Sequence, residues 1–241
     1  LAWGADVYFD MSRIPADAVE ISAIGKQWMY KFQHPQGQSE INDLHVPVNR
    51  PIKLSMISQD VIHSFFVPAF RIKQDVLPGN YTYTWFEATK TGEYHLFCAE
   101  YCGLDHAVMG GKVIVMEQAE YERWLTEGNV GTNNNAGADS VASVGEALFQ
   151  EQGCTSCHQM DGSGPGPSLV DVFGQEVELE DGSVVLADEQ YIRNSILLPN
   201  EQIVANYASI MPTYETRLSE EQIMELISYI KSLSTTNGGG E

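Results

Sequence analysis

The chain has 241 residues, 43% of them hydrophobic, so it can form one large or two small domains with packed cores and is not expected to be disordered. Acidic residues outnumber basic residues by 33 to 13, and the net charge of −20 disfavours contact with nucleic acid or anionic membrane surfaces. The same charge suits either simple solubility or recognition of a basic or weakly charged protein partner. No apolar run reaches the roughly 18 residues of a membrane-spanning helix.

Residues 1–14 show no clear periodicity, but strand-like segments follow from residue 18 onward. Residues 19–24 alternate between apolar and polar side chains, and residues 28–32 continue with aromatic side chains. Turn signals separate the segments at residues 35–37, 49–51, 78–79 and 90–92. Further strands are predicted at residues 43–48, 52–58, 61–67, 80–88, 92–97 and 112–116. Many short strands at this spacing predict an all-β Greek-key sandwich or barrel.

The loop between the last two predicted strands concentrates soft metal ligands. It carries Cys98, Cys102, His106 and Met109, and His63 is available from an earlier strand. One thiolate, one thioether and two imidazoles would form a mononuclear blue-copper site. The second cysteine exceeds that requirement, and two thiolates on one loop can bridge two copper ions, with one histidine for each. The loop therefore predicts a dinuclear copper centre for one-electron transfer.

Two other interpretations of this loop remain open at this stage. In an exported protein, Cys98 and Cys102 could form a disulfide, although this leaves the two histidines and Met109 without a role. Zinc also binds thiolate and imidazole, but a methionine ligand argues against it. Three further histidines stand in no ligand pattern and are expected to be surface or strand residues, namely His34, His45 and His95.

Three motifs resemble the dicopper (CuA) domain of haem-copper oxidase subunit II. They are the segments 58–65, 73–79 and 98–109, within a match that covers roughly residues 15–117. The resemblance implies a cupredoxin-like fold in which Cys98 and Cys102 bridge both copper ions. It also implies that His63 and Met109 complete one copper, and that His106 and the backbone carbonyl of Glu100 complete the other.

The resemblance implies further roles outside the ligand set. Trp28 resembles the aromatic patch where electrons enter, although a tryptophan in a sandwich more often belongs to the core. Met29 and Tyr30 stand where many relatives carry two more aromatic residues. The Glu100 side chain would face the catalytic subunit and bind magnesium there, or remain a solvated carboxylate in an isolated domain.

Family members begin with membrane helices, whereas this sequence begins at Leu1 and has no signal-peptide pattern. We therefore expect Leu1 to Trp3 to be the remnant of an N-terminal membrane anchor that this sequence does not contain. The expected location is the periplasm or the outer face of the cytoplasmic membrane, with the chain as the soluble portion of an anchored subunit.

A change of composition marks a boundary after the predicted strands. A short helix is predicted at residues 117–126, followed by a segment rich in glycine and asparagine with almost no large apolar side chain. We predict a copper domain at residues 1–127, a flexible linker at 128–140 and a second, all-α domain at 141–241.

The second domain carries a haem-attachment motif. Ser143 is a candidate N-cap for a helix over residues 143–152, and Cys154, Cys157 and His158 then form Cys-x-x-Cys-His. In this motif two thiols bond the haem vinyl groups and the histidine becomes an axial ligand. A thioredoxin-like motif is the competing interpretation, but no βαβ pattern surrounds it.

The rest of this domain resembles a small class I cytochrome c. The turn at residues 164–169 resembles the one whose proline carbonyl, here of Pro167, accepts the axial imidazole N–H. Met211 would be the second axial ligand of the haem, which raises its potential. Helices are predicted at residues 188–197 and after a capping box at Ser219, and a hairpin is predicted at residues 174–185.

Two one-electron centres in one chain indicate an electron relay. We expect the electron-transfer subunit of a haem-copper terminal oxidase, which passes electrons from an external donor protein through c-type haem and dinuclear copper to catalytic subunit I. Within that oxygen-reducing, proton-translocating cytochrome-c oxidase, this chain would carry electron transfer only. The alternatives are a free dicopper and haem carrier, the electron-entry subunit of a nitric-oxide reductase, and a non-catalytic copper-delivery protein.

Overall fold

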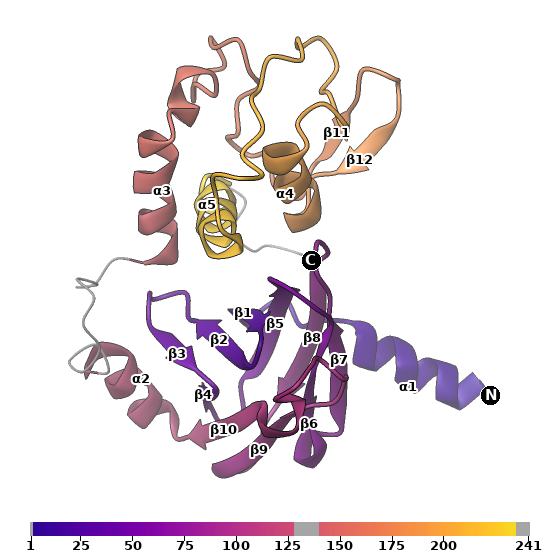
Figure 1. The fold of residues 1–241 in the computed structure, drawn as a ribbon, viewed down its shortest axis with the longest axis vertical. Coiled ribbons are helices and arrows are strands. Elements are labelled where there is room, and N and C mark those ends of the chain that lie inside the picture. Colours follow the sequence, from indigo (N-terminus) through magenta and orange to yellow (C-terminus); the bar gives the residue numbers. More distant parts are fainter. Residues whose placement is uncertain (1, 128–139, 235–241) are drawn as a thin grey trace. The chain divides into compact units, whose positions relative to one another are not determined.

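The structure is a computed structural model that describes residues 2–127 and 140–234. The chain divides into two compact units, Leu1–Ala138 and Asp139–Glu241 (Figure 1). The predicted linker at residues 128–140 lies outside the described residues except for Ser140. In the described part of the chain, no helix is both long and apolar enough to cross a membrane.

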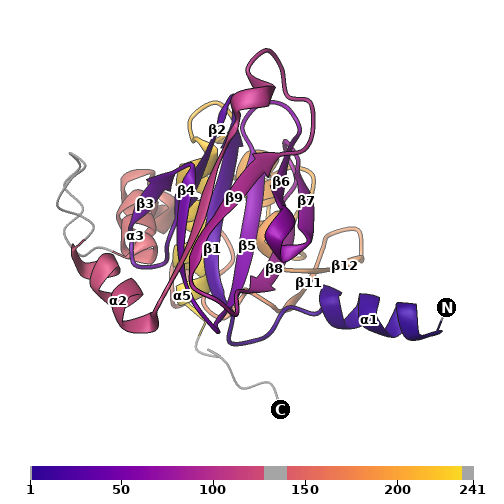
Figure 2. The ribbon, with the colours of Figure 1, turned by 90° about the horizontal axis from the view of Figure 1, so that it is seen from below.

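The first unit is a sandwich of two five-stranded sheets, whose strands are seen along their length in Figure 2. One sheet has the order β3-β2-β1-β5-β8 and the other the order β4-β10-β9-β6-β7. The strands are β1 (Val19–Lys26), β2 (Met29–Gln33), β3 (Ser39–Ile41), β4 (Asp43–Pro47), β5 (Pro51–Ser58), β6 (His63–Val67), β7 (Ile72–Val76), β8 (Thr82–Glu87), β9 (Gly92–Cys98) and β10 (Gly110–Met116). The predicted β-sandwich is confirmed, and β3 and β7 are strands that the sequence pattern did not indicate.

Side chains that alternate along the strands fill the space between the two sheets. Phe32 of β2 and Phe65 of β6 come from opposite sheets, are fully buried, and meet edge to face with ring centroids 6.2 Å apart. Edge-to-face packing is the geometry that the ring quadrupoles favour. The core of the sandwich is therefore made by protein side chains from both sheets, and it continues to Cys98, Cys102 and Met109 at one end.

Two helices flank the strands of this unit. The helix α1 (Ala2–Ser12) is exposed along most of its length and is tied to β8 by a hydrogen bond of 2.7 Å from the Trp85 indole to the carbonyl of Met11. The predicted helix after the last strand is present as α2 (Gln118–Glu127).

The prediction that His34 would be a partnerless surface or strand residue was wrong. His34 follows β2, is fully buried, and its ring lies 2.7 Å from Glu40 and 3.0 Å from the Tyr121 hydroxyl of α2. His45 bonds to the same carboxylate and stacks on Trp124 at 4.6 Å. His95 is exposed in β9, as expected. Burial without hydrogen-bond partners would cost several kcal/mol, roughly 2–7, so the carboxylate explains how an imidazole can lie in this core.

The second unit is mainly helical, as predicted. Its elements are α3 (Val141–Glu151), η4 (Cys154–Ser156), β11 (Glu176–Glu178), β12 (Val184–Leu186), α4 (Glu189–Leu197) and α5 (Glu220–Ser232). The predicted N-cap at Ser143 was wrong, because Ser140 caps α3 and its hydroxyl accepts the Ser143 N–H. The hairpin and the capping box at Ser219 are confirmed.

Helices α3 and α5 approach closely because of a glycine. A Cβ at Gly145 would lie 2.0 Å from the carbonyl oxygen of Glu225, so no larger residue fits at the crossing. One turn further along α3, Phe149 packs on Tyr229 with ring centroids 5.3 Å apart. The two helices thus form one wall of the unit, and α4 contacts α5 as well.

Candidate metal centre and cofactor pocket

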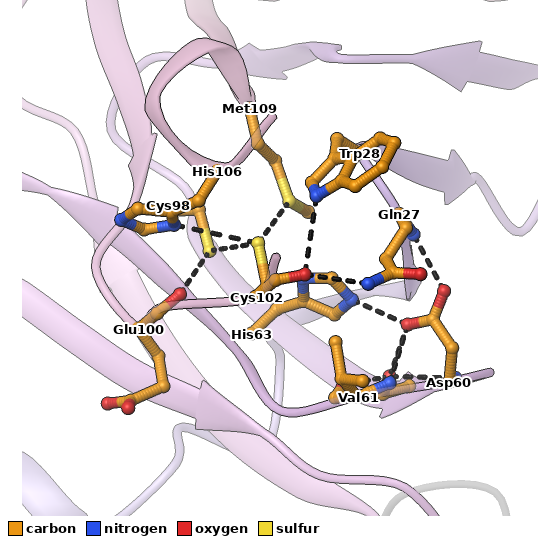
Figure 3. Close-up of polar contacts among 11 residues, drawn as sticks. Gln27, Trp28, Asp60, Val61, His63, Cys98, Glu100, Cys102, His106 and Met109 are labelled. Atoms are coloured by element: carbon orange, nitrogen blue, oxygen red, sulfur yellow. Dashed lines mark hydrogen bonds and ion pairs between the residues drawn. The ribbon is translucent and has the colours of Figure 1, made fainter. Parts of the chain in front are cut away.

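The predicted metal ligands meet at one end of the sandwich because of strand pairing. Phe65 of β6 lies opposite Cys98 at the end of β9, which places His63, at the start of β6, next to the loop. The loop from Cys98 to β10 is closed by a backbone hydrogen bond of 3.2 Å from Cys98 to Met109. Figure 3 shows that the sulfur atoms and the imidazole rings converge from these two segments.

The distances between ligand atoms fit bound metal, and the two cysteines are not bonded to each other. Both cysteines are free, with their Sγ atoms 3.8 Å apart, and the Met109 sulfur lies 3.6 Å from Cys102. Two atoms bound to one ion at about 2.3 Å in tetrahedral geometry are about 3.8 Å apart. The other close atoms are His106 Nδ1, at 3.5 Å from Cys102 Sγ, and the carbonyl oxygen of Glu100, at 3.3 Å from Cys98 Sγ.

His63 offers one ring nitrogen to the same point. Its Nε2 lies 2.8 Å from the Asp60 carboxylate, which therefore fixes the proton on Nε2. Its Nδ1 is buried and has no hydrogen-bond partner. One ligand atom from His63, Cys98 and Cys102 can be chosen so that all three lie within 4.8 Å of one another. A buried imidazole nitrogen without a partner, next to two thiols, is what a metal site requires.

The two thiols have different proton affinities. Burial opposes ionisation of Cys98, but the neighbouring His63 side chain and the backbone at Glu100 lower the pKa of its thiol to about 6. Burial and the negative charge on Cys98 raise the pKa of Cys102 to about 12. Two thiolates in contact repel each other, so without a cation only one ionises readily. A bound metal cation removes this restriction, because coordinated thiols are deprotonated.

A second layer of polar groups holds the loop. The Cys102 carbonyl accepts hydrogen bonds from the Gln27 side chain at 2.7 Å and from the Trp28 indole at 3.2 Å. Asp60 accepts the backbone N–H groups of Gln27 and Val61 in addition to orienting His63. Sequence reasoning missed Gln27 and Asp60, although Asp60 lies inside the motif at residues 58–65, three residues before His63.

Trp28 and Glu100 lie beside the ligands. The Trp28 side chain is half-buried and packs on the sandwich core, so its two expected roles are compatible. Glu100 is exposed. Around the loop, Tyr101, Leu104 and Val108 are 76%, 88% and 77% exposed, so apolar surface surrounds the site.

The second unit contains a cavity of about 640 Å³, partly open to solvent, next to its Cys-x-x-Cys-His motif. Cys154, Cys157, His158 and Met211 all line this cavity, and most other lining side chains are apolar. The His158 Nδ1 lies 2.8 Å from the Pro167 carbonyl oxygen, so the hydrogen bond expected from the sequence is present. The other ring nitrogen, Nε2, is then free of a proton and available to a metal.

The cavity fits a flat apolar cofactor attached through sulfur. Two free cysteines, a histidine with a fixed tautomer and a thioether share one apolar space, and Gly166 lies against the imidazole, where a Cβ would come within 3.2 Å of it. Ligand pockets of this kind are mostly apolar with few polar groups. Sequence reasoning found the four key residues but not the apolar residues that shape the cavity.

Comparison with known proteins gives one family for each unit. Residues 38–118 match the family described as "Cytochrome C oxidase subunit II, periplasmic domain", and residues 142–234 match the family "Cytochrome c". A cytochrome c oxidase subunit 2 from Alkalihalophilus pseudofirmus is 33% identical over 223 residues, which cover 90% of this chain and 62% of the relative.

Two further similarities complete the comparison. A cytochrome c oxidase subunit 2 from a Bacillus species is 29% identical over 231 residues, with 90% of this chain and 63% of the relative covered. The crystal structure of the periplasmic domain of subunit II of cytochrome oxidase from Bradyrhizobium japonicum is 35% identical and covers 47% of this chain and 94% of that one, with a TM-score of 0.45. The chain spans less than two thirds of the length of both curated relatives.

Proposed function

Because the chain joins a cytochrome c oxidase subunit II periplasmic domain to a cytochrome c domain, we propose that it passes single electrons between two metal cofactors on their way to a haem-copper terminal oxidase. The observation that carries the proposal is the convergence of His63 Nδ1 and two free cysteine sulfurs in one buried site. The large apolar cavity around His158 in the other unit supports a second cofactor.

In the first unit, Cys98 and Cys102 would bridge two copper ions. His63 and Met109 would complete one ion, and His106 with the Glu100 carbonyl would complete the other. Two copper ions bridged by thiolates share one unpaired electron, and the site rearranges little when it is reduced. The protein contributes by burying the sulfurs, fixing the His63 tautomer through Asp60 and holding the loop through Gln27.

In the second unit, Cys154 and Cys157 would bond the haem vinyl groups, with His158 and Met211 as axial ligands. A haem with this ligand pair supplies a one-electron centre of raised potential. Pro167 holds the proton on His158 Nδ1 and so leaves Nε2 to the iron. Because both units belong to one chain, each meets the other at a high effective concentration.

The assembly partners belong to the same proposal. Electrons would come from an external donor protein to the haem, pass to the copper pair, and leave for catalytic subunit I. The apolar surface around Tyr101 and Leu104 suits contact with protein, and the exposed Glu100 carboxylate would be positioned to bind magnesium at such an interface. The chain would work on the periplasmic side of the membrane.

Metal and haem analysis of the purified chain tests the proposal. We expect two copper ions and one covalently attached haem per chain, with a paramagnetic-resonance spectrum that shows more hyperfine lines than one copper nucleus gives. The variant C102S should lose the shared-electron spectrum and keep the haem spectrum. A single copper per chain in the fully loaded protein, or haem that solvent extraction removes, would contradict the proposal.

A further inference from the structure

Tyr30 stands out because its hydroxyl is buried next to the candidate copper site. Its side chain is 0% exposed, and its hydroxyl oxygen has no hydrogen-bond partner, sulfur included, among the described residues. It lies on β2, opposite Gly25 of β1. A hydroxyl buried without a partner is destabilising, by roughly 1–3 kcal/mol, and a phenylalanine would avoid that penalty.

The ring of Tyr30 packs against the segment that carries the ligands. It meets the His63 ring edge to face at 6.4 Å and the Phe65 ring at 6.0 Å, and Phe65 lies opposite Cys98 in the strand pairing. Tyr30 belongs to the other sheet of the sandwich. Its side chain therefore crosses the core and ends beside the ligand cluster.

The chemistry of the two groups is complementary, and their ionisation agrees with this packing. Burial raises the pKa of Tyr30 far above its ordinary value, and the neighbouring Cys98 raises it further. Burial opposes ionisation of Cys98, but the neighbouring His63, backbone and Tyr30 groups lower the pKa of its thiol. A phenol O–H can donate a hydrogen bond and a thiolate sulfur can accept one.

We propose that the Tyr30 hydroxyl donates a hydrogen bond to the Cys98 sulfur of the loaded copper site and thereby raises the reduction potential of that site. This inference rests on the proposed function, since it assumes that copper binds to Cys98. Tyr30 acts through the ligand and does not touch the metal, so it is a positioning and tuning residue.

The direction of the effect follows from charge. When the copper pair accepts one electron, no bond is made or broken, and the added negative charge is partly carried by the thiolate sulfurs. A hydrogen-bond donor at sulfur stabilises this extra charge and therefore favours the reduced form. Hydrogen bonding around a copper-bound cysteine is an established means of setting the potential of copper sites.

The substitution Tyr30→Phe tests the proposal, because it removes one oxygen and keeps the ring. We expect the equilibrium constant for one-electron reduction of the copper pair to fall by roughly threefold to tenfold, as for one lost hydrogen bond, where tenfold corresponds to about 59 mV. The thiolate-to-copper absorption bands should shift with it. The measurement is a redox titration of the full chain, with the haem followed separately at its own wavelengths.

A matched control is available in the same unit. Tyr121→Phe removes another buried hydroxyl, one that bonds to His34 at 3.0 Å, and should leave the copper potential unchanged. In the wild-type chain, transfer into heavy water should shift the copper–sulfur stretching bands, and this shift should be smaller in Tyr30→Phe. This second readout remains available if the variant folds poorly.

The outcomes separate this inference from the proposed function. If the wild-type chain binds no copper pair, the proposed function fails first. If it binds copper but Tyr30→Phe and Tyr121→Phe have the same potential as the wild-type chain, only the role of Tyr30 is overturned. Insensitivity of the wild-type bands to heavy water would overturn it as well.

Discussion

The two units are built around their cofactor sites in opposite ways. The sandwich has a complete core of its own, and its metal ligands lie at one end of that core, already held by hydrogen bonds with Gln27, Trp28 and Asp60. The helical unit instead surrounds a cavity of about 640 Å³, and its helices α4 and α5 contribute side chains to the walls. The copper ions would bind to a sandwich that is already folded, whereas the haem would fill the core of the helical unit and so complete its fold.

This difference indicates how far the stability of each unit depends on its cofactor. Unfilled space in a protein core is destabilising, by about 24 cal/mol per Å³ where water is excluded, and the pocket of about 640 Å³ is lined mostly by apolar side chains. The walls must therefore collapse or take up water when the cofactor is missing. In the copper unit, by contrast, the ligand sulfurs are already in mutual contact.

The largest expected effect follows from preventing haem attachment. The double substitution C154A/C157A should leave the second unit largely unfolded, because its cavity would no longer be filled by a covalently held group. Far-ultraviolet circular dichroism should show the loss of helix. All four tryptophans, Trp3, Trp28, Trp85 and Trp124, belong to the first unit, so their fluorescence reports independently that the sandwich has remained folded.

The corresponding double substitution in the copper unit completes this test. C98A/C102A should abolish copper binding but keep the tryptophan fluorescence of a folded sandwich, since its core does not depend on the metal. The contrast between the units would be wrong if the helical unit kept a cooperative unfolding transition without haem, or if the sandwich unfolded without copper.

Two glycines provide the next largest effect and address protein packing alone. A Cβ at Gly145 would lie 2.0 Å from the Glu225 carbonyl oxygen, and one at Gly111 would lie 1.8 Å from that of Asn42. Overpacking of this kind costs about 1–3 kcal/mol or more. G145A should lower the stability of the helical unit only, and G111A that of the sandwich only, as measured by the two signals above.

The glycine at position 4 is the control for this pair. A Cβ there would meet nothing within 4 Å, and alanine is the better helix former, so G4A should be neutral or slightly stabilising. If G145A also left the stability of the helical unit unchanged, the contact of α3 with α5 would not be as close as the structure indicates.

A smaller effect is expected at Asp60, which holds a candidate ligand without being one. D60N should leave the fold intact but loosen the tautomer and orientation of His63, whose Nε2 now lies 2.8 Å from the carboxylate. Loss of such a partner typically weakens metal binding by about 10–100-fold. Competition with a copper chelator measures the change. Unchanged copper affinity in D60N would show that His63 is held by packing alone.

The sequence was sufficient to predict the sandwich, the helical unit and the residues that gather at the two sites. Alternation, turn residues and ligand spacing are local signals, and Cys98 to Met109 or Cys154 to His158 are contiguous in the chain. Strand β3 was missed because it has only three residues, Ser39–Ile41, which no local rule separates from a loop. Strand β7 was missed because its three central residues are all polar, so it shows no alternation of apolar and polar side chains.

The residues missed at the sites are those whose partners lie far along the chain. Gln27 bonds to Cys102, 75 positions away, and His34 bonds to Tyr121, 87 positions away. Neither pairing follows from spacing, because it depends on which strands and helices become neighbours after folding. The N-cap of α3 was misplaced for a simpler reason, since Ser140 and Ser143 are both serines in a suitable position and only the fold distinguishes them.

The smallest expected effect concerns the buried carboxylate that holds His34 and His45. Burial opposes ionisation of Glu40, but hydrogen bonds from His34 and His45 outweigh it and lower the pKa of Glu40 below its ordinary 4.5. A lowered carboxyl pKa stabilises the folded state above pH 4.5, and this contribution is lost as the pH falls through the folded-state value. E40Q should therefore destabilise the copper-free sandwich at neutral pH by about 1–3 kcal/mol, and less in acid.

Tryptophan fluorescence during denaturant unfolding measures this directly, because Trp124 stacks on His45 beside Glu40. The control is E93Q, which breaks the exposed pair between Glu93 and Lys112, 2.6 Å apart. Exposed pairs contribute little, so E93Q should have almost no effect at any pH. If the stability difference between E40Q and the wild-type chain stayed constant from neutral pH into acid, the Glu40 carboxylate would not be the charged centre of this cluster. The stability of the sandwich away from its metal site would then come from apolar packing alone, which would widen its contrast with the cofactor-dependent unit.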